Sequence, residues 1–334
     1  LQLQDLAWLA ERSRGVIVSE QSPVVIIGFN RPTLIARVFR AVSQARPPRL
    51  YLVMDGPRAN VPSDAEKVRR TREAVSQVDW PCEVVEIIAS ENMGLKNRIV
   101  SGLTEVFRTA DRAIVLEDDC VPDSTFFSYC DELLDRYSDE PTVGVISGSS
   151  RLRGQKVSPY SYDFSSDLRI WGWATWSRTW TTLVESGDLE ASWSDQQQRE
   201  ILSRLPDGAR KQSMSKMLKS AGTLDSWALP FAVHFAQRGY LSAVPHINLV
   251  ENIGFGVEST HTQFEDYVSQ VPATTMDLPL SHPPVIQVNP QLDALESRLD
   301  AREWWLYPLR HPISVGARFF RYALRVISAW NGKK

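Results

Sequence analysis

The first 150 residues alternate between short apolar runs rich in β-branched residues and longer amphipathic segments. The run 23–29 (PVVIIGF) has the length and composition of a buried strand. Over 33–44, apolar side chains recur three and four residues apart, which is the spacing of a helix packed on one face. Because strands that alternate with helices form βαβ units, this half predicts an α/β fold with a mixed, mostly parallel sheet flanked by helices.

The same patterns predict the other elements of this half. The expected strands are 23–29, 50–54, 84–89, 113–116 and 143–147, and the expected helices are 33–44, 63–78, 95–108 and 126–137. Ser63 and Glu66 have the spacing of a capping box at the start of the second helix. Further along, residues 151–165 indicate an irregular polar loop, and 186–222 indicate a helical insertion.

Polar side chains follow three of the predicted strands. Asn30 and Arg31 follow the first strand, Asp55 follows the second, and the acidic triplet 117–119 follows the fourth. Since ligands of parallel sheets bind at the carboxyl ends of the strands, we expect these residues to meet at one edge. Neither G-x-G-x-x-G after the first strand nor G-x-x-x-x-G-K-[ST] occurs, which disfavours a dinucleotide fold and a P-loop.

The triplet consists of Glu117, Asp118 and Asp119. Adjacent carboxylates repel one another unless a cation lies among them. Mg²⁺ and Mn²⁺ prefer carboxylate oxygens, and one or two carboxylates often hold such an ion together with the phosphates of a substrate. A solvated acidic turn is the alternative, but the place of the triplet in the expected cleft favours a divalent-metal site.

The order of these motifs resembles that of GT-A fold glycosyltransferases, in particular the N-acetylglucosaminyltransferase I type and related bacterial enzymes. The resemblance rests on N-R-P, D-G and E-D-D after the three strands, and then on WGW at 171–173, LDSW at 224–227, NIGFG at 252–256 and STH at 259–261. It implies a GT-A (Rossmann-like) domain over 1–262, with a nucleotide half at 23–150 and an acceptor half at 151–262.

The resemblance also implies an activity. A metal-dependent inverting glycosyltransferase would transfer a sugar from a nucleotide sugar, such as UDP-N-acetylglucosamine, to a hydroxyl of a glycan or lipid-linked glycan in bacterial surface polysaccharide synthesis. Mn²⁺ or Mg²⁺ would be held by Asp119, with Asp118 and His261 beside it. Asp225 would be the general base, because apolar neighbours raise the pKa of a carboxylate and make it a better proton acceptor. A helix N-cap is the alternative role for Asp225.

The implied donor site has a nucleotide part and a sugar part. The nucleotide would be held by polar residues that follow the strands: Asn30, Arg31, Asp55 and Glu117. Lys96 opens a predicted helix, where phosphates bind, although a solvated lysine fits equally well. The sugar would lie against a glycine that permits close backbone approach and against aromatic rings from the 11 tryptophans: Trp171, Gly172, Trp173 and Trp227.

The charge distribution separates the end of the chain from the body. The net charge of −3 does not indicate binding to nucleic acid. Residues 301–334, however, carry seven basic residues and one acid. We therefore expect 263–334 to be a linker and a basic amphipathic tail, a C-terminal helical extension with its helix over 313–330. The tail (302–334) either contacts an anionic membrane peripherally or docks on the body. The segment 265–300 could reach a second subunit, so a homo-oligomer stays open.

Two more expectations concern location and alternative functions. Three cysteines without regular spacing, a first segment (1–14) unlike a signal peptide, and no long apolar stretch indicate a cytoplasmic protein, with contact at the inner face of the cell membrane as an option. A nucleotidyltransferase has a similar sheet but would need a basic loop after the first strand. A catalytically silent glycan-binding or scaffold protein is the non-enzymatic alternative.

Overall fold

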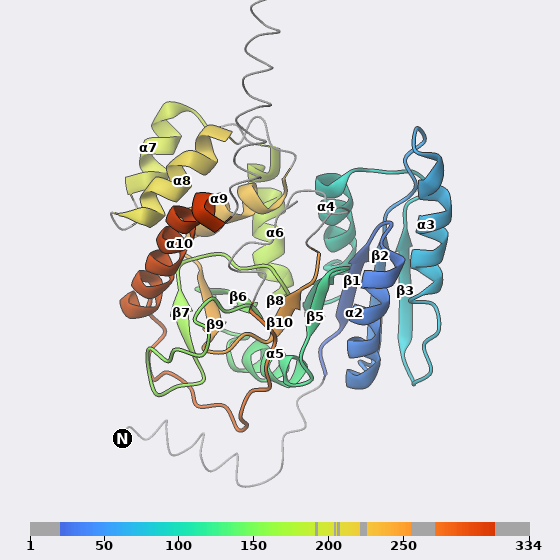
Figure 1. Cartoon of the computed structure of the whole chain (residues 1–334), viewed down its shortest axis with the longest axis horizontal. Coiled ribbons are helices and arrows are strands. Elements are labelled where there is room, and N and C mark those ends of the chain that lie inside the picture. Colours follow the sequence, from blue (N-terminus) through green and yellow to red (C-terminus); the bar gives the residue numbers. More distant parts are fainter. Residues whose placement is uncertain are drawn as a thin grey trace, which may run out of the picture.

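A computed structural model describes residues 21–190, 193–203, 205, 208–220, 226–254 and 271–310 of the chain. Its centre is an eight-stranded mixed sheet with helices on both faces (Figure 1). The strands of this sheet are β1 (Val24–Gly28), β2 (Arg49–Met54), β3 (Glu83–Ile88), β4 (Arg112–Glu117), β6 (Val143–Ser147), β7 (Tyr162–Ser165), β8 (Trp173–Trp176) and β9 (Leu241–Pro245). An antiparallel pair, β5 (Cys120–Pro122) and β10 (Val250–Asn252), lies beside it.

The strand order is β3-β2-β1-β4-β8-β6-β9-β7. Pairing is parallel from β3 to β4 and between β6 and β9, while β8 and β7 run against their neighbours. Six strands therefore share one direction, which confirms the predicted α/β fold with a mixed, mostly parallel sheet. Every residue of β1 is buried, as expected for a central strand covered on both faces.

Alternating side chains of the strands fill two apolar layers. Ile26, Leu52 and Leu116 belong to a core with helices α2 (Pro32–Ala45) and α5 (Thr125–Arg136). On the other face the neighbouring residues of the same strands pack against helices α4 (Leu95–Val106), α6 (Ser177–Glu185) and α9 (Ala228–Arg238). The sheet is thus the middle of three layers, and its strand ends remain available at the edges.

The helix that follows β2 differs from the prediction at both ends. Helix α3 covers Pro62–Glu73, with Val61 as the N-cap residue and no hydrogen bond from a capping side chain. The expected capping box of Ser63 and Glu66 is therefore wrong, because proline at the first helical position moves the start of the helix upstream of Ser63. The glutamate instead pairs with Arg69 one turn later, and the helix ends before residue 78.

The second half contains strands and helices that the sequence did not resolve. Strand β7 lies inside the segment 151–165, for which the sequence predicts an irregular loop. The expected insertion does contain helices: α7 (Asp195–Ser203) and α8 (Ala209–Ser220) follow a 3₁₀ turn at Asp188–Glu190. Among the described residues, no helix combines the length and apolar character that crossing a bilayer requires.

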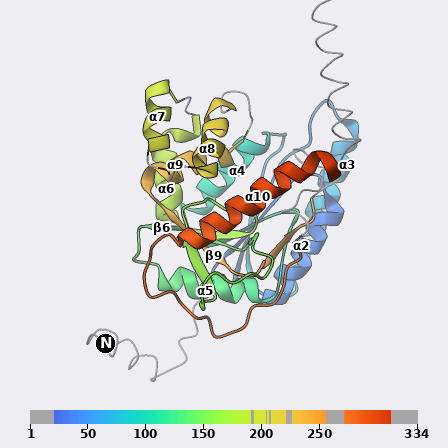
Figure 2. The ribbon, with the colours of Figure 1, turned by 60° about the vertical axis from the view of Figure 1, so that its left-hand side comes forward.

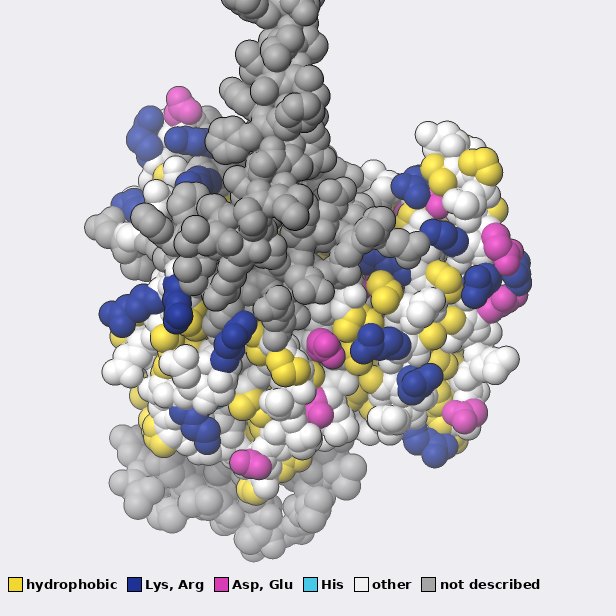
Figure 3. All heavy atoms as spheres, in the orientation of Figure 1, with side chains coloured by type: hydrophobic (Ala, Val, Ile, Leu, Met, Phe, Trp, Pro, Cys, Tyr) yellow, Lys and Arg dark blue, Asp and Glu magenta, His cyan; other side chains and the backbone are white. Residues whose placement is uncertain are grey.

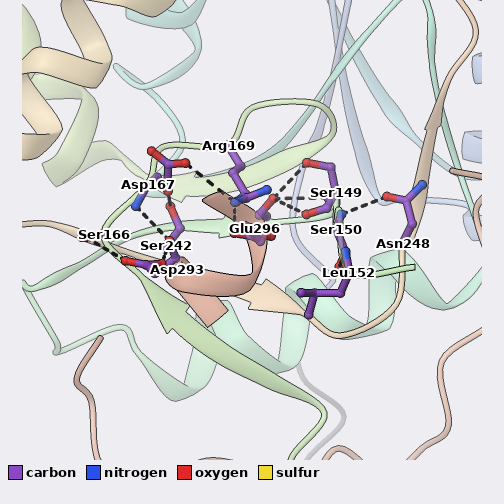
Figure 4. A network of polar contacts seen from close by, with 12 residues as sticks. Ser149, Ser150, Leu152, Ser166, Asp167, Arg169, Ser242, Asn248, Asp293 and Glu296 are labelled. Atoms are coloured by element: carbon purple, nitrogen blue, oxygen red, sulfur yellow. Dashed lines mark hydrogen bonds and ion pairs between the residues drawn. The ribbon is translucent and has the colours of Figure 1, made fainter. Parts of the chain in front are cut away.

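Helix α10 (Pro290–Arg310) lies across one face of the molecule in Figure 2, over the region of β7 and β9. Its Glu296 forms a buried ion pair with Arg169 (Figure 4). Its Asp293 accepts a 2.6 Å hydrogen bond from the Ser165 hydroxyl. Upstream, the Thr274 amide bonds to the carbonyl of Asn248. Part of the expected linker, 271–300, thus packs on the body, whereas the predicted helix 313–330 lies outside the described residues.

Charged side chains are dispersed over the described part of the face in Figure 3. On the face shown in Figure 3, Lys and Arg of the described residues are spread widely, with Asp and Glu between them. Elsewhere in the described residues charges pair locally, as in the 2.7 Å contact of Arg49 with Glu83. No single basic patch forms on the described part of this face.

Candidate functional site

The carboxyl ends of β1, β2 and β4 meet at one edge of the sheet. In the parallel register Gly28 lies opposite Met54, and Ile27 lies opposite Glu117. The residues that follow these strands are therefore neighbours, although Arg31 and Asp119 are 88 positions apart in the sequence. This confirms the expected convergence of Arg31, Asp55 and the acidic triplet at one edge.

Arg31 bridges two members of the triplet. Its Nη1 lies 3.2 Å from Oδ1 of Asp118 and 2.9 Å from Oδ2 of Asp119. The three side chains are 13%, 11% and 17% exposed. Burial alone would lower the pKa of Arg31, but the two carboxylates raise it above its ordinary value. The guanidinium therefore stays charged and neutralises part of the acidic cluster.

The other charges of the triplet are incompletely balanced. Burial raises the pKa of Glu117 to about 8, and repulsion from Asp119 and Asp118 adds to the shift. Burial likewise raises the pKa of Asp118 to about 7, against the opposing effect of Arg31. Three carboxyl groups thus face one guanidinium, and a further cation would favour their ionised forms.

The donor atoms of the triplet fit a hard divalent cation, since all are carboxylate oxygens. Asp118 and Asp119 would hold it, because Arg31 already draws their oxygens to one point. Within the described ranges, no three His, Cys, Asp or Glu side chains are arranged as a metal-binding group. His261, the third expected ligand, lies outside the described residues.

The backbone of Asp119 is held by the segment that follows β10, the partner of β5 in the small sheet. Its carbonyl accepts a 2.8 Å hydrogen bond from the Ile253 amide. A Cβ atom on Gly254 would lie 2.0 Å from Oδ2 of Asp119, so only glycine fits there. The motif at 252–256 is recognisable from the sequence, but neither strand is, because three-residue strands carry too little periodicity.

Asp55 is buried and anchors the loop before α4. Its Oδ1 accepts hydrogen bonds from the amides of Gly56 and Met93, both at 2.9 Å, and its Oδ2 accepts one from the Asn92 side chain at 2.8 Å. These contacts hold the segment after β3 against the end of β2. Its expected contact with a nucleotide stays a prediction.

Asn30 supports the same edge through helix α3. Its amide donates to Oδ1 of Asp64 at 2.9 Å, and Asp64 also pairs with Arg58 at 2.5 Å. The bond from Arg58 is the main reason that the pKa of Asp64 is lowered. The Asn30 side chain is thus engaged within the protein, and its role toward a nucleotide also stays a prediction.

Sequence reasoning missed a buried arginine near this edge. Lys96 lies in the first turn of α4, as expected, and Arg98 follows in the same helix. Arg98 is 5% exposed, and its Nε and Nη2 have no hydrogen-bond partner within the described protein. Burial lowers its pKa, and Asp55 opposes that shift. No spacing or composition distinguishes Arg98 from an exposed helical arginine.

Two of the expected sugar-binding residues are core residues. Trp173 and Trp227 are 1% and 3% exposed, and their rings stack at 6.0 Å between centroids. The ring of Phe231 in α9 packs against both of these rings. The sequence motif alone does not reveal which of its aromatic rings become buried. Trp173 is the first residue of strand β8 and therefore belongs to the sheet. Direct contact of these two rings with a sugar is therefore not accommodated in this conformation.

Gly172 is required by the fold itself. It adopts a positive φ of 61°, and a Cβ there would lie 2.5 Å from a methyl group of Val250. Its carbonyl accepts a 2.7 Å hydrogen bond from the Gly148 amide. The preceding Trp171 is only partly buried, and it remains the aromatic candidate for a sugar contact. The expected base, Asp225, lies outside the described residues.

A cavity of about 740 Å³ opens at the opposite, amino edge of the sheet. Its lining includes Arg49 and Arg112, which pair with Glu83 and Asp135. None of the expected site residues lines it. The candidate site is therefore the acidic edge and not this cavity.

No known protein-family model matches the chain. No curated protein sequence matches it at a significant level either.

Proposed function

We propose that the chain is a metal-dependent inverting glycosyltransferase that uses a nucleotide-sugar donor, in the first instance a UDP-sugar. The acceptor in this proposal is a hydroxyl of a glycan or lipid-linked glycan of a bacterial surface polysaccharide. The proposal keeps the GT-A assignment that the motif order indicated.

One observation carries the proposal. Arg31, Asp118 and Asp119 form a compact charged cluster at the edge where Asp55 and the start of α4 also lie. An acidic group beside a positive helix N-terminus suits a ligand that combines a metal with a diphosphate. Gly254 lies against Asp119, so the motif at 252–256 and the acidic triplet 117–119 are neighbours although they are far apart in the sequence. This contact supports assigning both motifs to one site.

The proposed chemistry divides between the two halves of the chain. A bound Mn²⁺ or Mg²⁺ would offset the charge that develops on the departing diphosphate. Asp118 and Asp119 hold the metal, and Asp55 with Asn92 holds the loop that faces the nucleotide. Asp225 accepts the proton of the acceptor hydroxyl, and a single base acting on the acceptor inverts the anomeric centre.

The first test is turnover of a panel of nucleotide sugars by the full chain, with and without Mn²⁺. We expect metal-dependent release of the nucleoside diphosphate, from slow hydrolysis even without an acceptor. The absence of metal-dependent turnover with every donor would count against the proposal. Release of pyrophosphate from a nucleoside triphosphate and a sugar phosphate would instead identify a nucleotidyltransferase.

Two substitutions separate the proposed roles. Asp119→Ala should abolish metal-dependent nucleotide binding, whereas Asp225→Asn should keep binding and lose turnover. Asp135→Asn is the matched control, because Asp135 pairs with Arg112 at the opposite edge of the sheet. A chain that binds glycan but tolerates both site substitutions is a binding or scaffold protein rather than an enzyme.

The proposal extends to the tail. Residues 302–334 would bring the acceptor half to an anionic membrane surface, since the segment 301–334 has seven basic residues and one acid. Flotation of the full chain with anionic and neutral liposomes tests this. Equal flotation with both kinds of liposome would contradict it.

A further inference from the structure

We propose that Arg31 is an internal counter-ion that occupies the metal position and is exchanged for the divalent cation. The inference rests on the proposed function, because the cation is the one proposed there. In this arrangement Arg31 weakens metal binding until a phosphate-bearing donor arrives. Arg31 is thereby a positioning residue that makes metal binding depend on the nucleotide.

The first observation is that one nitrogen serves two carboxylates. The same Nη1 atom of Arg31 lies 3.2 Å from Asp118 and 2.9 Å from Asp119. A single cationic atom between two carboxylate oxygens takes the place that a divalent ion takes between two ligands. The three side chains are each less than one fifth exposed, so a divalent ion held by the same two oxygens would meet the charge of the guanidinium at close range.

The second observation is that the backbone holds Asp119 in place, while Arg31 reaches the carboxylates through a long side chain. Asp119 is fixed by the Ile253 amide and by the close backbone of Gly254. The backbone of Arg31 is fixed too, since its carbonyl accepts from the Ile35 amide at 3.1 Å and Pro32 follows it as the first residue of α2. Only the arginine side chain needs to rotate, so the exchange leaves the fold intact.

The charges explain why the exchange has a direction. Removing the guanidinium leaves two adjacent, largely buried carboxylates without the cation that lies 3.2 Å and 2.9 Å from them, so Arg31 departs only when another cation replaces it. The released guanidinium carries five N–H donors, and the natural partner for it is the phosphate of a bound nucleotide. Metal and nucleotide therefore each favour the binding of the other.

The test measures Mn²⁺ binding to the full chain without nucleotide, by the electron paramagnetic resonance signal of the free ion. Arg31→Gln should bind Mn²⁺ about tenfold more tightly than the wild type or better, because a competing charge a few ångströms away is gone. Arg31→Lys, which keeps the charge, should resemble the wild type. Arg49→Gln removes a paired arginine at the far end of β2 and should change nothing.

The opposite result is equally clear. Weaker or unchanged Mn²⁺ binding in Arg31→Gln overturns the inference, because an arginine that merely orients the carboxylates would give that result. If no variant binds Mn²⁺, the inference also fails. The transferase activity is then judged separately by the turnover of nucleotide sugars by the wild type: transfer without metal would keep the sugar transfer and overturn only its metal dependence.

A measurement on the wild type covers the case in which Arg31→Gln does not fold. In protein labelled with ¹⁵N-arginine, the guanidinium signal of Arg31 is assigned by its absence from the Arg31→Lys spectrum. Saturating Mg²⁺ should move this signal toward that of a solvent-exposed arginine. A signal that stays at the position of a carboxylate-bound guanidinium overturns the inference.

Discussion

Gly254 lies against Asp119 so closely that a Cβ atom at position 254 would be 2.0 Å from Oδ2 of the carboxylate. We expect Gly254→Ala to push this carboxylate out of place and to weaken metal-dependent nucleotide binding by about tenfold or more, equivalent to about 1.4 kcal/mol. Overpacking of this kind costs about 1–3 kcal/mol of stability at most sites. Titration calorimetry with Mn²⁺ and UDP measures the binding.

Gly154→Ala is the matched control for this change. Gly154 has a positive φ of 78° with nothing within 4 Å of the place that a Cβ would take, so the substitution adds backbone strain without touching the site. We expect it to lower the melting temperature and to leave binding intact. Unchanged binding in Gly254→Ala would show that the position of Asp119 is not needed for the ligand.

Asp55→Asn should disturb the loop before α4. The aspartate accepts from two backbone amides and from the Asn92 side chain, but an asparagine presents an amino group to one of these donors. An unsatisfied buried donor costs about 1–3 kcal/mol, so we expect a loss of that size in chemical denaturation and weaker nucleotide binding. If Asn92→Ala gives the same loss of binding with Asp55 intact, the loop and not the carboxylate contacts the nucleotide.

The parallel half of the fold could be predicted because its central strands are buried on both faces. Strands β1 and β4 are continuous apolar runs, and the breaks after them are polar, so the edge that holds Arg31 and Asp119 followed from the order of the elements. The half that contains β7, β8 and β9 could not be predicted from the sequence, because these short strands pair with segments that are distant along the chain. Trp173 begins β8 and is covered by α9, a relationship that no local spacing encodes.

Within the site, the location of the residues could be predicted from the sequence, but their contacts could not. The sequence placed the carboxylates at one edge but did not indicate that Arg31 bridges two of them, because such pairing depends on side-chain direction. It likewise gave no sign that Arg98 is buried on α4 or that Glu296 is buried on α10. A buried charge on a helix has the same spacing as an exposed one, so the sequence does not distinguish the two.

The buried pair of Arg169 and Glu296 should determine how firmly α10 is attached. The two residues are 4% and 3% exposed, and Arg169 already has two nitrogens without a hydrogen-bond partner in the described residues. Glu296→Ala leaves this guanidinium buried without its close partner, which should cost about 3–5 kcal/mol in chemical denaturation. The double variant Arg169→Met, Glu296→Leu should lose much less than the sum of the single changes. Additive losses would mean that the ion pair does not link α10 to the body.

His234 should make stability depend on pH below neutrality. Burial lowers its pKa below the ordinary value of 6.5, although Asp188, whose Oδ2 lies 2.7 Å from Nδ1, opposes the shift. The unfolded imidazole takes up a proton as the pH falls below 6.5, whereas the folded one resists it. The free energy of unfolding should therefore rise with pH up to about 6.5 and then level off. In urea denaturation at pH 5 to 7.5, His234→Gln should flatten this rise, and an identical slope in the variant would assign the dependence to another group.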